Sequence, residues 1–168
     1  HAGHVSTTPA RATVKNAVPV VEAGPNRSAF EGAFLVLTAT FTDAGILDTH
    51  TAVVDWGDGT KSTATVSETP GAGPRVGGAG SISARHAYGD NGLYTVTVCA
   101  TDDDGGQGCD SAQVAVANVS PSLAILPAQM ANEGSHIEIA SATFSDPGFD
   151  NPAARTAEDF AAVIDWGD

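Results

Sequence analysis

Two identical tetrapeptides constrain this chain more than any other sequence feature. Asp55-Trp56-Gly57-Asp58 recurs as Asp165-Trp166-Gly167-Asp168. Other residues recur at a nearly constant offset: Asn16 as Asn118, Pro19 as Pro121, Glu31-Gly32 as Glu133-Gly134, and Thr40-Phe41-Thr42-Asp43 as Thr143-Phe144-Ser145-Asp146. The tetrapeptides lie farther apart than these pairs, which places an insertion at 149–160 of the second copy. The repetition predicts one complete unit followed by the opening of a second.

Composition favours small globular domains built from strands and turns. The 168 residues are 42% hydrophobic and 16% charged, which suits a globular chain, and 19 glycines and 9 prolines favour turns. The formal net charge of −13 argues against nucleic acid or an anionic membrane surface as partner, and it is compatible with bound cations. No stretch approaches the roughly 20 apolar residues of a transmembrane helix, so we expect no direct membrane insertion.

Short runs of alternating apolar residues predict an all-β fold, a two-sheet antiparallel sandwich. Expected strands of the first unit cover residues 19–22, 34–42, 51–56, 61–66, 81–88, 93–101 and 110–116. About seven short strands in roughly 100 residues are typical of such a sandwich. We expect a flexible leader at 1–14, the complete sandwich at 15–119, and the N-terminal half of a second one at 120–168. In that half, strands are expected at 137–144 and 160–166.

The only two cysteines, Cys99 and Cys109, predict a disulfide. In the expected strands around them the apolar residues are even-numbered and both cysteines are odd-numbered, so both face away from the core. A hairpin turning at 102–107 brings them to facing positions, where a disulfide fits. Such a bond indicates an oxidising, extracytoplasmic compartment. The alternative is two free thiols in a cytosolic protein.

Three motifs in order resemble the polycystic kidney disease (PKD) repeat. They are Val54-Asp55-Trp56-Gly57-Asp58-Gly59-Thr60, then His86-Ala87-Tyr88, then Gly92-Leu93-Tyr94-Thr95-Val96-Thr97-Val98, followed by the acidic Thr101-Asp102-Asp103-Asp104-Gly105. The resemblance covers about residues 15–119 and implies an immunoglobulin-like sandwich. Residues 120–168 resemble the first half of another copy. The acidic loops are similar to those of tandem PKD arrays in bacterial surface and secreted proteins.

The resemblance implies a structural role for the tetrapeptide rather than an active site. The implied turn consists of Asp55, Gly57, Asp58 and Gly59, and the implied core side chains are Trp56, Tyr88 and Tyr94. His86 follows a strand pattern, and we expect it to be a hydrogen-bonded structural histidine. The cysteine pair departs from the family pattern, which does not require it. No hydrolase, metalloprotease, P-loop or dinucleotide motif is present, so we expect no enzyme.

In a sandwich of this topology, one end gathers oxygen-bearing side chains. Asp102 and Asp104 lie in a hairpin loop, Asp43 and Asp48 lie in the loop between the second and third strands, and Asn16 lies in the entering segment. Adjacent carboxylates repel one another, and Ca²⁺ needs six or more oxygen ligands. We therefore predict a Ca²⁺ site at this end, with a solvated acidic loop as the alternative.

The junction between the two units predicts a second, weaker Ca²⁺ site. Asn118 comes from the linker, Asp146 and Asp150 from the second unit, and Glu31 and Asp90 from the far end of the first. A cation at this place would stiffen the array.

Two functions are compatible with these features. The first is a non-catalytic structural or adhesive module of a larger extracellular or cell-surface protein of tandem repeats, stiffened by Ca²⁺. The second is an accessory module that holds polysaccharide or protein substrate for a secreted hydrolase, which requires a row of exposed aromatic side chains. The partners expected for the first are other domains or subunits of a surface assembly, including a homo-oligomer or filament contact through residues 121–168.

Overall fold

The computed structural model describes residues 11–69, 77–124, 126–139 and 141–166, and within these ranges every regular element is a strand. The strands are β1 (Val20–Glu22), β2 (Arg27–Phe30), β3 (Phe34–Asp43), β4 (His50–Asp55), β5 (Lys61–Thr69), β6 (Gly78–Ala87), β7 (Gly92–Asp102), β8 (Gln107–Ala117), β9 (Ser122–Leu123) and β10 (Phe144–Ser145). Residues 70–76, between β5 and β6, lie outside the described residues, as does most of the predicted leader.

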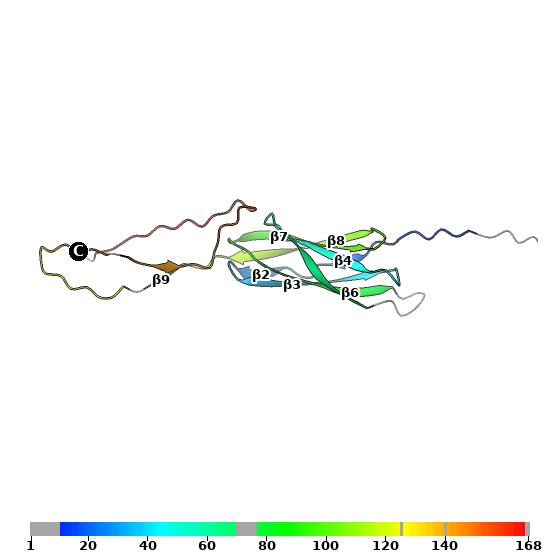
Figure 1. Ribbon diagram of the computed structural model, residues 1–168, viewed down its shortest axis with the longest axis horizontal. Coiled ribbons are helices and arrows are strands. Elements are labelled where there is room, and N and C mark those ends of the chain that lie inside the picture. The colour runs from blue at the N-terminus through cyan, green and yellow to red at the C-terminus, as the bar shows by residue number, and fades with distance from the viewer. Residues whose placement is uncertain (1–10, 70–76, 125, 140, 167–168) are drawn as a thin grey trace, which may run out of the picture.

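Eight strands form an immunoglobulin-like sandwich, which confirms the predicted all-β fold (Figure 1). One sheet contains β1, β3 and β6, and the other contains β4, β7, β8 and β2. Strand β5 belongs to both. Its first half pairs with β4, from Ala64↔Ala52 to Lys61↔Asp55, and its second half pairs with β6. The leader and the segment after residue 120 leave the sandwich at opposite ends (Figure 1).

The core lies between the two sheets and follows the alternation of the sequence. Leu37, Ala39 and Phe41 of β3 and Val96, Val98 and Ala100 of β7 are all buried and belong to one core cluster. Residues between them point outward because successive side chains of a strand alternate between its faces. The largest buried side chain is Trp56, which directly follows β4. Alternation therefore identified the inward faces correctly.

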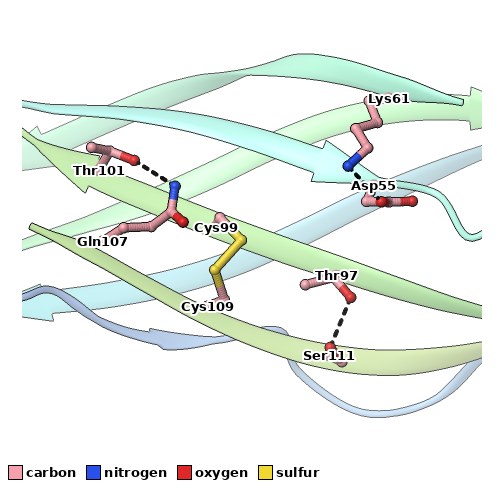
Figure 2. The surroundings of a disulfide bond; sticks show 8 residues. All are labelled: Asp55, Lys61, Thr97, Cys99, Thr101, Gln107, Cys109 and Ser111. Carbon is pink, nitrogen blue, oxygen red and sulfur yellow. Dashed lines mark hydrogen bonds and ion pairs between the residues drawn. A yellow bond between two sulfur atoms is a disulfide. The ribbon is translucent and has the colours of Figure 1, made fainter.

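The two cysteines form the predicted disulfide on the outer face of the sandwich. Cys99 of β7 and Cys109 of β8 are directly paired in the sheet register, and their Cα atoms lie 4.1 Å apart. Figure 2 shows polar cross-strand pairs on either side of the bond: Thr97 with Ser111 at 2.9 Å, and Gln107 with Thr101 at 3.0 Å. The alternative of two free thiols does not apply to this structure.

Residues 121–166 form far less regular structure than the first unit. Ser122–Leu123 pairs with Phe144–Ser145 in a separate two-stranded sheet. The strand predicted at 137–144 is limited to its last residue, and the strand predicted at 160–166 is not formed. A strand needs a hydrogen-bonded neighbour, and the described part of this segment offers few. Whether these residues are half of a second domain stays a prediction.

Candidate functional site

Three carboxylates gather at the end of the sandwich where the leader enters. Asp43 ends β3, Asp102 ends β7, and Asp48 lies in the loop after β3. One carboxylate oxygen of each lies within 4.8 Å of the others. Asp43 and Asp102 are both 4% exposed, which is unusual for aspartate. The strand ends thus bring together three of the five residues predicted for the first cation site.

Hydrogen bonds fix the orientation of these carboxylates. Asn16 donates from Nδ2 to Oδ2 of Asp102 at 2.8 Å, and the Gly106 amide donates to the other oxygen of Asp102 at 2.7 Å. The Gly45 amide donates to Oδ1 of Asp43 at 2.6 Å. Asn16 is therefore brought to the cluster, as a contact of Asp102. Asp104 is exposed and lies outside the group of three.

The charges of this cluster oppose one another. Burial and repulsion from Asp43, together with weaker repulsion from other acidic residues of the loops, including Asp104, raise the pKa of Asp48. The hydrogen bond from Asn16, which outweighs desolvation, lowers the pKa of Asp102. One carboxylate is thus held ionised beside another whose ionisation is disfavoured. A hard cation would relieve the repulsion, since it prefers carboxylate oxygens.

Two further residues beside this cluster, His50 and Glu68, were not among the predicted site residues. His50 is 8% exposed; its Nδ1 lies 2.8 Å from Oε2 of Glu68, and its Nε2 lies 3.5 Å from Oδ2 of Asp43. Burial opposes protonation of His50, but the hydrogen bonds that its ring makes to the carboxylates of Glu68 and Asp43 outweigh burial and raise the pKa of His50. Glu68 lies beyond the strand predicted at 61–66, in the half of β5 that pairs with β6.

A second group of carboxylates lies at the opposite end of the sandwich. Glu31 follows β2, Asp90 lies in the turn between β6 and β7, and Glu158 comes from the insertion of the second copy; their oxygens lie within 4.8 Å of one another. Glu31 and Asp90 were predicted for the second cation site, whereas Glu158 was missed. The insertion has no counterpart in the first copy, so the repeat gave no register for it.

The other three residues predicted for the second site lie around this group rather than in it. Asn118 is exposed and precedes Val119, whose amide donates to Oε1 of Glu31 at 2.6 Å. The carboxylates of Asp146 and Asp150 accept hydrogen bonds from the amides of Gly148 and Glu158, at 2.8 and 3.0 Å.

The tetrapeptide of the first unit builds a turn and an aromatic stack. Trp56 is 1% exposed, donates from Nε1 to Oγ of Ser62 at 3.0 Å, and stacks on His86. His86 contacts Tyr88, whose hydroxyl donates to the carbonyl of Trp56 at 3.1 Å, and Tyr88 stacks on the half-buried Tyr94. Burial raises the pKa of Tyr88. These side chains are packed and hydrogen-bonded, an arrangement that stabilises the fold.

The two aspartates of the tetrapeptide have different surroundings. Asp58 is 3% exposed and accepts hydrogen bonds from the Thr60 amide at 3.0 Å and hydroxyl at 2.6 Å, while its other oxygen lies 2.8 Å from Nε2 of His86. Asp55 caps the Gly57 amide at 3.1 Å and pairs with Lys61 at 2.9 Å on the surface (Figure 2). Both carboxylates hold the turn in place.

The sandwich, its aromatic stack and its terminal carboxylates define an immunoglobulin-like module. The family described as PKD domain matches residues 16–117, which is more than half of the chain. The protein therefore belongs to the PKD domain family, a family of non-catalytic modules, in agreement with the resemblance of its motifs.

Other comparisons add little. One similar solved structure is the BIgI domain of beta protein from S. agalactiae, bound to CEACAM1, which has 16% sequence identity over 58% of this chain and 93% of that chain, with a TM-score of 0.31. A comparison with curated proteins finds no match. Within the described ranges, the chain contains no helix with the length and hydropathy needed to cross a membrane.

Proposed function

We propose that this chain is a non-catalytic spacer or adhesive module of a larger extracellular protein of tandem repeats, and that Ca²⁺ stiffens it. The observation that carries the proposal is the meeting of Asp43, Asp48 and Asp102 with Asn16 of the entering segment. A cation held there would join the segment that precedes the sandwich to two of its loops. When the segment that enters the module is fixed in this way, the orientation of one repeat determines the orientation of the next.

The disulfide and the family support an extracellular location, such as a bacterial surface. Disulfides persist in oxidising compartments, and the Cys99–Cys109 bond crosses two strands that are already paired. The net charge of −13 supports cations rather than nucleic acid as ligands. The alternative is an accessory substrate-binding module. It has less support because Trp56 and Tyr88 of the sandwich are buried, which leaves Phe30 and Phe34 as its large exposed aromatic side chains.

The experiment that tests the cation is a pair of melting curves, one with millimolar Ca²⁺ and one with chelator. A site occupied at about 100 times its Kd adds about 2.7 kcal/mol, which raises the Tm of a domain of this size by several degrees. Asp48→Asn should reduce this increase, because it deletes one charge of the cluster, and among the described residues no backbone amide donates to this carboxylate. Asp103→Asn, an exposed neighbour outside the group of three, is the matched control. A Tm that is indifferent to Ca²⁺ would contradict the proposal.

We also propose that residues 121–166 contact another domain or another copy of the chain. Leu123, Phe144, Phe160 and Val163 line an apolar groove and are 46–95% exposed. Apolar patches of this kind favour association. Light scattering across a concentration series should show self-association that Phe144→Ser weakens. A strictly monomeric chain at high concentration would remove the support for a homo-oligomeric contact.

A further inference from the structure

The insertion of the second copy docks onto the far end of the sandwich. The Phe149 amide donates to the carbonyl of Gly89 at 3.0 Å. Asn151, which is 8% exposed, donates from Nδ2 to Oδ2 of Asp58 at 3.0 Å. Asp58 belongs to the tetrapeptide turn, so the insertion is hydrogen-bonded to the most constrained part of the first unit.

Two glycines of the sandwich allow this close approach. A Cβ atom on Gly32 would collide with the backbone of Pro147, and one on Gly59 would lie 2.6 Å from the carbonyl oxygen of Ala153. Both glycines have positive φ, 69° and 82°, a region that side chains disfavour. The surface at this end of the sandwich is therefore shaped to receive residues 147–153.

Docking brings Glu158 to two carboxylates of the first unit. Its ligand oxygen lies within 4.8 Å of those of Glu31 and Asp90. Glu158 and Asp90 are half-buried, and Glu31 is 1% exposed. Among the described residues, none of the ion pairs involves any of the three. Three acids from three separate segments therefore converge, and the described residues provide no basic partner for them.

Glu31 supplies an independent reason to expect a ligand. Its Oε1 accepts a hydrogen bond from the Val119 amide at 2.6 Å, whereas its Oε2 is buried and has no hydrogen-bond partner within the described part of the chain. An unsatisfied buried polar atom costs about 1–3 kcal/mol, and a charged one costs more. The carboxylates of Glu31, Asp90 and Glu158 also lie close enough to repel one another. Positive charge at this place would satisfy the free oxygen and offset the repulsion.

We propose that Glu31, Asp90 and Glu158 bind a divalent cation, Ca²⁺, that locks the insertion of the second copy onto the first unit. An all-oxygen set suits Ca²⁺, which takes six to eight oxygens, whereas Zn²⁺ prefers nitrogen and sulfur. Further oxygens would come from Asp146 and Asp150, whose charges act on Glu158, and from water. The inference extends the proposed Ca²⁺-stiffened spacer, on which it rests, because a cation shared by both units fixes the angle between them.

The test is calorimetric titration of the full chain with CaCl₂. The wild type should bind at two sites, and Glu158→Gln should bind at one. Glu138→Gln, an exposed glutamate of the same segment, is the matched control and should retain both sites. Asp48→Asn should lose the site at the other end of the sandwich, so the two variants test Ca²⁺ binding at each end separately. If Asp48→Asn binds as much Ca²⁺ as the wild type but Glu158→Gln binds less, the site at Asp48 is wrong and the site at Glu158 is supported. If Glu158→Gln binds Ca²⁺ with the stoichiometry of the wild type, the site at Glu158 is wrong.

Hydrogen exchange tests whether the cation holds the insertion in place. Ca²⁺ should slow exchange of the Phe149 and Asn151 amides at least tenfold in the wild type and have no such effect in Glu158→Gln. Glu31→Gln is a second variant, because its amide can still accept the Val119 hydrogen bond. It should melt higher than the wild type in chelator and gain less from Ca²⁺. If the exchange rates of the Phe149 and Asn151 amides in the wild type do not change with Ca²⁺, the proposed lock is wrong.

Discussion

The same tetrapeptide occurs in two regions of this chain with opposite results. Trp56 of the first unit is 1% exposed, whereas Trp166 of the second region is 58% exposed. Phe41 is 2% exposed and its counterpart Phe144 is 50% exposed. The first unit has β6, β7 and β8 to face these side chains, and the described residues after 120 contain no equivalent strands. The motif therefore does not bury its tryptophan by itself; the facing strands do.

The largest expected effect comes from removing each tryptophan in turn. Trp56→Ala should cost about 3–5 kcal/mol, because it leaves a cavity between the sheets, out of the roughly 5–15 kcal/mol available to a domain. Trp166→Ala should change the free energy of unfolding by less than about 0.5 kcal/mol, since exposed side chains contribute little. Urea unfolding followed by far-UV circular dichroism measures both. Equal losses from the two substitutions would break the comparison.

A smaller effect is expected at Asp58, which links the two regions. Burial opposes its ionisation, but hydrogen bonds from the Thr60 hydroxyl, His86 and the Thr60 amide outweigh burial and lower the pKa of Asp58. Asp58→Asn should cost about 1.5–3 kcal/mol at pH 7, the range for hydrogen bonds to charged groups.

The pH dependence of this loss has a defined sign. Because the folded-state pKa is lowered, the ionised carboxylate stabilises the fold above its unfolded-state pKa of about 4, and this contribution disappears as pH falls through the folded value. The difference between wild type and Asp58→Asn should therefore shrink below about pH 4. Asp55→Asn, which breaks the surface pair with Lys61, is the control and should cost at most about 1 kcal/mol. If the difference in free energy of unfolding between wild type and Asp58→Asn stays constant down to pH 2, the charge of Asp58 is not what stabilises the turn.

Much of the first unit was predictable because its signals are local. Alternation gave the inward faces of β3, β4 and β7, and the parity of Cys99 and Cys109 gave the disulfide. The division of β5 between two sheets was not predictable, since its alternating residues are only half-buried and resemble those of an ordinary edge strand.

The candidate sites likewise contain residues whose positions were predictable from the sequence and residues whose positions were not. Asp43, Asp48 and Asp102 could be placed together because strand ends in a sandwich meet at defined loops. Glu158 could not, because its position depends on how an insertion folds back onto another unit. In the second region the prediction from alternation was wrong at Ile137, which is 47% exposed and not in a strand. Alternation shows which residues suit a strand, but it does not show whether a partner strand is present.

The most direct test of the comparison is acrylamide quenching of tryptophan fluorescence in the wild type and in Trp166→Phe, where only Trp56 remains. Trp166→Phe should emit at shorter wavelength than the wild type and resist quenching. The wild type should contain a second, readily quenched fraction from Trp166. If Trp56 alone is quenched as freely as the wild type, or if the wild type has no accessible fraction while monomeric, the claim that facing strands decide the burial of this motif is wrong.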